Sequence, residues 1–335
     1  MRNIAEKIRL SIIIPNYNYA DFVGKAIESA LAVDWPDVEI IVVDDGSTDA
    51  SRDVIKSFGK QITAIFQDNA TQRVACNTGF AHSSGNVIIF LDSDDILEPQ
   101  IAREIAAAWG TEVSKVQVQM ARIDANGRKT GSVFPAFDPL PTPQSIRDWC
   151  IKVAAYPTPP GSGNAYARWF LEKLFPLDNS CGNFSDSACL ATAPFFGDVV
   201  TIAKPLVLYR VHGSNDSNLS ADDRLFAREI ARAQAKLHYT QRITAPMGIT
   251  LQEKTLFKSL HLLSFRVASL KLRPREHPLA EDGLARAAGD AVQALWSFPA
   301  ASLKIKFILT SWAIITLSMP KGLARWLIIK RFRLH

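Results

Sequence analysis

The chain has 335 residues, of which 47% are hydrophobic and 21% are charged, so its composition excludes general disorder and its length allows two domains. The formal net charge of +5 is unevenly divided, because residues 221–335 carry +11 and residues 1–220 carry −6. None of the four cysteines has Cys-x-x-Cys spacing, and charges interrupt the N-terminal apolar residues. We therefore expect reduced, structural thiols and a catalytic part that stays in the cytoplasm.

Short apolar runs alternate with helical patterns through the first hundred residues. The pattern predicts helices over 21–31, over 73–83 and from about 99, and strands over 10–15, 38–43, 63–66 and 87–91. Strands and helices that alternate at this spacing predict an α/β sheet with parallel strands. No Gly-x-Gly-x-x-Gly or P-loop motif follows the first strand, which disfavours the corresponding nucleotide sites.

The fourth predicted strand leads directly into Asp92-Ser93-Asp94-Asp95. Carboxylates at this spacing repel one another unless a cation or hydrogen-bond donors neutralise them. In an open α/β sheet they would lie at the carboxyl edge, where ligands bind, together with the acidic loop after Val43. Their oxygens suit Mg²⁺ or Mn²⁺, with a diphosphate completing the shell. The alternative is that they cap the helix that follows.

Four motifs in a fixed order resemble the family 2 glycosyltransferases: residues 11–18, residues 42–49, Arg73 with Asn77 and Gly79, and Gly85 with residues 90–95. The resemblance covers about residues 10–215. It implies a GT-A fold, in which helices flank a Rossmann-like, mostly parallel central sheet. It also implies a nucleotide-sugar donor, Mn²⁺ or Mg²⁺ as the cofactor, and transfer with inversion at the anomeric carbon.

The resemblance also implies roles for individual residues on the donor side. Pro15 and Tyr17 match residues that contact the nucleobase, and Asp45 matches a carboxylate that accepts from the base N3–H. Arg73 matches a residue near the diphosphate. Asp92 and Asp94 match the Asp-x-Asp pair, with Asp94 the direct metal ligand and Asp92 nearer the ribose and the metal shell. As alternatives, Tyr17 is an ordinary loop aromatic and Arg73 a solvated helix residue.

Asp186 matches the family's general base, which would take the proton of the acceptor hydroxyl. Here Ser185 replaces the usual Glu, and Ala191-Thr192-Ala193 replaces charged residues, which leaves the identity of the acceptor open. The alternative role for Asp186 is a helix cap. His212, in a Tyr-Arg-x-His motif, is either a further metal ligand or a structural histidine.

Three further segments lie between residues 111 and 215. Residues 113–123 alternate as an exposed edge strand would, and residues 199–209 predict two short strands. In the loop before a predicted helix, where the resemblance implies a wall of the acceptor site, Gly161 and Gly163 would let the backbone approach the sugar. The alternative is a plain turn with a helix cap. The Gln-x-x-Arg-Trp motif of processive synthases is absent, because Ala165 stands before Arg168-Trp169 at the position where the motif has Gln. We therefore expect one sugar to be transferred per encounter.

The C-terminal region is basic and helical. Apolar residues over 256–270 form a helical stripe, for which packing onto the catalytic domain or against a neighbouring helix is expected. Residues 307–320 carry no charge, and these 14 residues are fewer than the roughly 17–25 that span a bilayer. From Lys304 onward there are seven basic residues and no acidic ones. Interleaved aromatic and aliphatic residues favour an anionic membrane surface over nucleic acid, the alternative being that 307–319 packs as core.

The resemblance implies a GT-A catalytic domain over 1–220, and the C-terminal pattern predicts a membrane-associated helical extension over 221–335. The predicted enzyme moves a sugar from a nucleotide sugar to a hydroxyl of a glycan or lipid-linked acceptor, and UDP is the expected nucleotide because the family most often uses it. It would act in surface polysaccharide synthesis at the cytoplasmic face of the membrane, as a peripheral or monotopic protein. An inactive GT-A protein that binds nucleotide sugars is one alternative. A nucleotidyltransferase is another, although no Gly-rich, basic loop follows the first strand.

Overall fold

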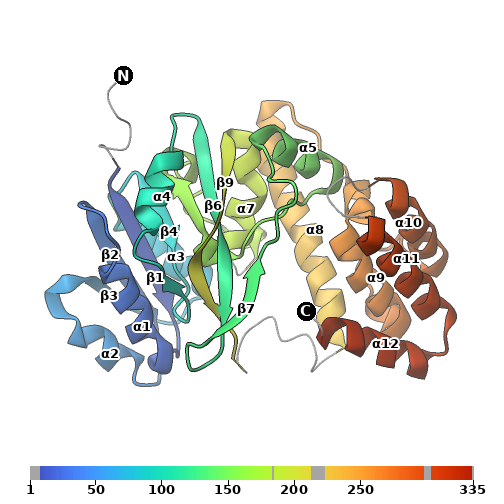
Figure 1. The fold of residues 1–335 in the computed structure, drawn as a ribbon, viewed down its shortest axis with the longest axis horizontal. Coiled ribbons are helices and arrows are strands. Elements are labelled where there is room, and N and C mark those ends of the chain that lie inside the picture. Colours follow the sequence, from blue (N-terminus) through green and yellow to red (C-terminus); the bar gives the residue numbers. More distant parts are fainter. Residues whose placement is uncertain (1–7, 183–184, 213–222, 298–302, 334–335) are drawn as a thin grey trace. The chain divides into compact units, whose positions relative to one another are not determined.

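The computed structural model describes residues 8–182, 185–212, 223–297 and 303–333 (Figure 1). The chain forms two compact units, which we call the catalytic unit (Met1–Arg147 with Pro157–His212) and the helical unit (Asp148–Tyr156 with Gly213–His335). The domain border expected between residues 220 and 221 lies outside the described residues.

The catalytic unit is built on a nine-stranded sheet with the order β3-β2-β1-β4-β8-β6-β9-β5, and β7 pairs with β6. The strands β3, β2, β1 and β4 are parallel, as predicted, and β8 runs antiparallel between β4 and β6. The strands are β1 (Leu10–Asn16), β2 (Val38–Asp45), β3 (Thr63–Gln67), β4 (Val87–Phe90), β5 (Ile96–Leu97), β6 (Val113–Ile123), β7 (Lys129–Phe134), β8 (Asn164–Ala167) and β9 (Asp198–Arg210).

Helices cover both faces of the parallel strands because these strands are apolar on both sides. Ile12 and Ile14 of β1 share one core with α1 and α4. Ile13 faces the opposite way against α3, where a Cβ on Gly79 would lie only 2.3 Å from Ile13 Cγ2. The helices of this unit are α1 (Ala20–Leu31), α2 (Ser51–Ser57), α3 (Gln72–Ala81), α4 (Ile101–Ala108), α6 (Arg168–Leu171) and α7 (Ser185–Phe196), and the residues of α5 (Pro143–Val153) are divided between the two units.

Two strand predictions were wrong. The strand over residues 113–123 is not an edge strand, because β6 lies inside the sheet between β8 and β9. Its alternating polar residues are buried and satisfied: Lys115 Nζ donates to Thr158 Oγ1 and to Asn164 Oδ1, each at 2.8 Å. Residues 198–210 form the single strand β9 rather than two short strands, because β9 pairs with β6 on both sides of a register shift between Ile202 and Val207.

The helical unit contains α8 (Arg224–Thr244), α9 (Leu260–Leu272), α10 (Leu284–Ser297), α11 (Leu303–Ser318) and α12 (Lys321–Arg333). The predicted apolar stripe packs against neighbouring helices, since Leu263 and Val267 of α9 share a core with Ala287 of α10 and Ala313 of α11. The prediction of helix packing for this stripe is therefore confirmed. None of the described helices has the length and apolar character needed to cross a bilayer.

Candidate active site

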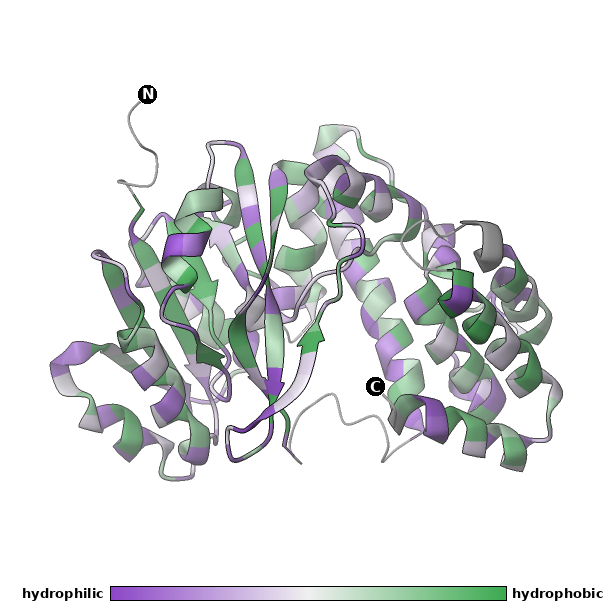
Figure 2. Cartoon of the chain, viewed as in Figure 1, coloured by the Kyte–Doolittle hydropathy of each residue, from purple (hydrophilic) through white to green (hydrophobic). Residues whose placement is uncertain are grey.

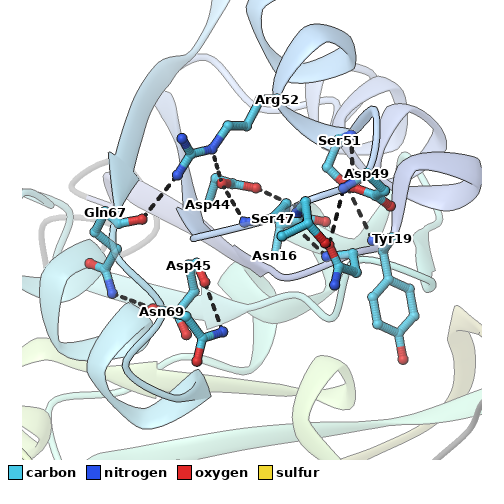
Figure 3. A network of polar contacts seen from close by, with 12 residues as sticks. Asn16, Tyr19, Asp44, Asp45, Ser47, Asp49, Ser51, Arg52, Gln67 and Asn69 are labelled. Atoms are coloured by element: carbon cyan, nitrogen blue, oxygen red, sulfur yellow. Dashed lines mark hydrogen bonds and ion pairs between the residues drawn. The ribbon is translucent and has the colours of Figure 1, made fainter.

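A polar network joins the carboxyl ends of β1 and β2 to the start of α2 (Figure 3). Asn16 Nδ2 donates to Asp44 Oδ2 at 3.0 Å, and Arg52 Nε donates to Asp44 Oδ1 at 2.8 Å. Burial acts to raise the pKa of Asp44, but hydrogen bonds from Ser47 and Arg52 outweigh it and lower the pKa. Asp44 is therefore an ionised structural anchor that fixes this edge of the sheet.

Asp45, the last residue of β2, lies beside this network with its carboxylate facing β3 and the start of α3 (Figure 3). Its Oδ1 accepts from Gln67 Nε2 at 2.6 Å and from the Ala70 amide at 3.0 Å, and its Oδ2 accepts from the Thr71 amide at 2.9 Å. A carboxylate has about four acceptor positions, so Asp45 can accept one further hydrogen bond.

The other two residues predicted to contact the nucleobase differ in exposure. Pro15 is buried at the end of β1, and its carbonyl accepts from Ser93 Oγ at 2.9 Å, which links β1 to the acidic loop after β4. Tyr17, two residues further along, is 45% exposed. Tyr17 therefore has an accessible ring, whereas Pro15 is buried and contacts the acidic loop through its backbone carbonyl.

The acidic loop after β4 is held by residues from two other segments. Ser162 Oγ accepts from the Asp92 amide at 3.0 Å and donates to Asp95 Oδ2 at 2.7 Å. Gln72 Nε2, at the start of α3, donates to Asp92 Oδ1 at 3.1 Å. Gly161 lies so close that a Cβ on it would be 3.2 Å from Asp92 Oδ2. These contacts fix the carboxylates in one arrangement.

The electrostatics of this loop are unfavourable for several ionised carboxylates. Burial and then the charges of Asp94 and Asp186 raise the pKa of Asp92 to about 8. Burial and then the charges of Asp92 and Asp94 raise the pKa of Asp95 well above its ordinary value. With all of these carboxylates ionised, the cluster would hold more negative charge than its donors compensate, which is the environment that a bound cation would stabilise.

His212, directly after β9, reaches the same cluster. Its Nε2 lies 2.9 Å from Asp94 Oδ2, and its ring stacks on Phe22 at a centroid distance of 4.8 Å. The neighbouring Arg210 donates from its backbone amide to Asp95 Oδ1 at 3.1 Å and from Nε to the Asp94 carbonyl at 2.9 Å. The structure thus brings the predicted ligands Asp94 and His212 into direct contact.

Within the described ranges, no three His, Cys, Asp or Glu side chains are arranged as a complete metal site. The donor chemistry nevertheless fits a hard cation, because carboxylates that lack compensation lie beside an imidazole. Asp94 and His212 would be the direct ligands, with Asp92 close by. The remaining ligands would have to come from outside the protein.

Asp186 lies in the first turn of α7, and its charge reaches Asp92, where it contributes to the raised pKa. The helix N-terminus favours a negative charge at this position. The preceding residues 183 and 184 lie outside the described part of the chain. The structure therefore brings Asp186 toward the cluster that contains Asp92 and Asp94.

Arg73 contacts a different segment. Its Nη1 donates to the Leu177 carbonyl at 2.6 Å and its Nη2 to Asn179 Oδ1, while its Nε is buried without a hydrogen-bond partner.

The two glycines of the predicted acceptor-side loop are explained by close packing. A Cβ on Gly163 would lie 2.6 Å from the Pro159 Cβ. Packing therefore already explains Gly163 and, as the Asp92 contact shows, Gly161.

Sequence reasoning assigned no individual role to Asp95 of the acidic loop, or to Gln72, Ser162 and Arg210, which contact this loop. Asp95 and Arg210 stand inside motifs that were recognised, so their positions carried a signal. Little in the sequence pointed to Gln72 or Ser162, except that Gln72 precedes Arg73 and Ser162 stands between two glycines.

The family model described as Glycosyl transferase family 2 matches residues 11–158. An uncharacterized glycosyltransferase of Nostoc sp. is 36% identical over 247 residues, which cover 70% of this chain and 74% of that protein. The structure of S. aureus TarS 1–349 in complex with UDP-GlcNAc has a TM-score of 0.54 at 15% identity, over 97% of this chain and 90% of that one.

The mannosyltransferase PcManGT from Pyrobaculum calidifontis, solved with GDP-Man and Mn²⁺, has a TM-score of 0.50 at 18% identity, over 98% of this chain and 85% of that one. The family model and the Nostoc relative show that the chain belongs to glycosyltransferase family 2, and the likeness to the two solved structures shows the fold. It is a glycosyltransferase with a GT-A fold, so the predicted family, fold and enzyme class are confirmed.

Proposed function

We propose that this glycosyltransferase moves a sugar from a nucleotide sugar, a UDP-sugar, to a hydroxyl of a glycan or lipid-linked acceptor, with inversion and one sugar per encounter. The observation that carries the proposal is the cluster of Asp92, Asp94, Asp186 and His212 at the carboxyl edge of the sheet. Both fold neighbours were solved with a nucleotide sugar, which supports the donor class.

Three residues would hold the nucleotide. The exposed ring of Tyr17 would stack on the base, and the remaining acceptor position of Asp45 would receive the base N–H. The buried, unpartnered Nε of Arg73 would donate toward the diphosphate. Each of these groups has hydrogen-bonding or stacking capacity that its present contacts leave unused.

The cation would be Mn²⁺ or Mg²⁺, held by Asp94 and His212 with Asp92 in its shell. When bound, it would stabilise the negative charge that develops on the leaving diphosphate. Ser162, Gln72 and Arg210 would keep the carboxylates in position, because they already donate to this loop or accept from it.

Asp186 would act as the general base. Its carboxylate would take the proton of the acceptor hydroxyl while that oxygen bonds to the anomeric carbon. The bond from this carbon to the diphosphate oxygen breaks on the opposite face, so the configuration inverts and the nucleoside diphosphate leaves. The proximity of Asp186 to Asp92 supports this role, because the base must lie beside the donor site.

We also propose that the enzyme works at the cytoplasmic face of the inner or plasma membrane, as a peripheral or monotopic protein, in surface polysaccharide synthesis. Residues 304–335 hold seven basic residues and no acidic ones, which supports contact with anionic lipid. A lipid-linked acceptor would then be presented at the same surface.

The test is binding and hydrolysis of UDP-sugars with and without Mn²⁺ or Mg²⁺. We expect the cation to strengthen UDP binding in calorimetry, and we expect Asp94→Ala to lose that gain. The control Asp53→Ala removes an exposed carboxylate of α2 and should retain the gain in UDP binding. If the cation strengthened UDP binding equally in Asp94→Ala, Asp94 would not be a metal ligand. Nucleotide binding without any hydrolysis or transfer would favour the inactive alternative.

A further inference from the structure

The helix α11 carries large apolar side chains on two opposite faces. On one face Leu309 and Ala313 are buried in the core shared with α9 and α10. On the opposite face four side chains are strongly exposed: Phe307 (60%), Ile308 (55%), Ile314 (41%) and Ile315 (44%). Packing of residues 307–319 as core, which was the alternative to contact with a membrane surface, therefore describes one face of the helix only.

The exposed side chains form one continuous stripe. Positions 307, 308, 311, 314 and 315 recur at spacings of three and four, so they share a face of the helix. Ser311 is the one polar residue among them, and no charged residue follows Lys306 within α11, as the hydropathy colours of Figure 2 reflect. We call this stripe the α11 surface. Exposed apolar stripes of this kind mark an interaction surface.

Basic residues flank the α11 surface in sequence. Lys304 precedes it, Lys321 and Lys330 of α12 follow it, and no acidic residue occurs between 303 and 333. In α12, Leu323 and Trp326 are also exposed, by 58% and 60%, and Lys330 Nζ lies 5.1 Å from the Trp326 ring centroid. Tryptophan and lysine together are typical of the layer in which lipid headgroups meet acyl chains.

We infer that the α11 surface lies on an anionic lipid bilayer, with α11 in the plane of the interface. Its four apolar side chains enter the acyl boundary, and the flanking lysines contact lipid phosphates. This inference deepens the membrane location in the proposed function and rests on it. Charge favours lipid over a second copy of the chain, because a symmetric pair would set lysines of equal sign against one another.

The first test measures how the full-length chain binds vesicles of phosphatidylglycerol and phosphatidylcholine. Phe307→Gln with Ile308→Gln should weaken binding by about tenfold or more, since two exposed apolar side chains are lost. The matched control, Leu284→Gln with Val292→Gln, replaces two side chains of α10 that are 46% and 42% exposed and should bind as the wild type does. High salt should release the wild type only in part, because apolar contacts are not screened.

The second test reports on the surface itself. The four native cysteines are buried, so a polarity-sensitive fluorophore can be attached selectively to Ser311→Cys at the centre of the α11 surface. We expect its emission to shift to shorter wavelength on adding anionic vesicles. The same label on Ser57→Cys, an exposed position of α2 in the catalytic unit, should show no shift.

Two outcomes would overturn the inference. One is wild-type binding by Phe307→Gln with Ile308→Gln. The other is no vesicle binding by the intact chain, together with a dimer in light scattering that the same variant dissociates, which would make a second copy the occupant. Donor hydrolysis without vesicles should be unchanged in this variant. A chain that binds vesicles but never hydrolyses or transfers a donor would contradict the proposed activity and leave the α11 surface intact.

Discussion

Two buried charge clusters, one in each unit, differ in how far their charges are compensated. In the helical unit, Arg266 is fully buried, and its guanidinium donates to Asp282 at 2.6 and 2.8 Å and to Asp290 at 2.7 Å. In the catalytic unit, Asp92 and Asp95 lie close together without a guanidinium or ammonium group in hydrogen-bond contact with their carboxylates among the described residues, and both pKa values are raised.

The direction of the pKa shifts expresses this difference. Burial would raise the pKa of Asp282, but hydrogen bonds from Arg266 and His277 outweigh it, so the pKa is strongly lowered. A buried charge that is fully paired holds a structure together, and removing one partner is costly. Buried charges of one sign without compensation cost stability, and their persistence indicates a site that a ligand completes.

The largest expected effect follows from neutralising one charge of the catalytic cluster. Asp186→Asn keeps the shape of the side chain and removes proton acceptance, so transfer should fall by about 10²–10⁴-fold. Because it also removes a charge that raises the pKa of Asp92, the melting temperature should not fall. Transfer assays and thermal unfolding measure the two effects. Asp53→Asn is the matched control, and near-normal turnover in Asp186→Asn would mean that another group is the base.

In the helical unit, by contrast, removing the compensating charge should destabilise the fold. Arg266→Met leaves Asp282 and Asp290 without their cation, and the free energy of unfolding should fall by about 3–5 kcal/mol. Arg273→Met breaks an exposed pair with Glu276 and should change it by at most about 0.5 kcal/mol. Urea unfolding compares the two variants. An Arg266→Met chain as stable as the wild type would show that the buried network contributes nothing.

A smaller effect is expected at Glu39, a compensated carboxylate of the catalytic unit. Burial would raise its pKa, but hydrogen bonds from Ser11 and from the amides of Ser84 and Gly85 lower it from 4.5 to about 2. At 1.36 kcal/mol per pH unit this corresponds to at most roughly 3 kcal/mol, and partial exposure of the side chain reduces the expected loss in Glu39→Gln to about 2 kcal/mol.

The pH dependence gives the sign of this contribution. Because the pKa of Glu39 is lower in the folded chain, its stabilisation is complete above about pH 4.5 and is lost as the pH falls toward 2. The wild type and Glu39→Gln should therefore differ at pH 7 and converge in acid. Glu28→Gln, which breaks an exposed pair with Lys25, should follow the wild type at every pH. A gap between wild type and Glu39→Gln that does not close in acid would exclude ionisation as its cause.

Much of the catalytic unit could be predicted from the sequence, because its signals are local. Continuous β-branched runs define β1, β2 and β4, and aspartates stand at the ends of β2 and β4. Parallel strands bring their carboxyl ends to one edge, so Asp45, Asp92 and Asp94 had to lie at that edge.

The other half of the sheet was decided by tertiary contacts. β6 shows the alternation of a half-exposed strand, yet its polar side chains point into the protein, where Thr158 and Asn164 satisfy Lys115. β8 has only four residues, too few for a period to be read. The contact of Ser162 with Asp95 joins residues that are 67 apart in sequence, which no local pattern encodes.

The helix α11 shows the same division within one element. Its sequence determined that it is apolar and that basic residues flank it, because those are properties of composition. Since its apolar residues surround the helix, the sequence contains no periodicity that distinguishes a buried face from an exposed one. Packing of Leu309 and Ala313 against α9 and α10 made that choice, and it left Phe307, Ile308, Ile314 and Ile315 uncovered.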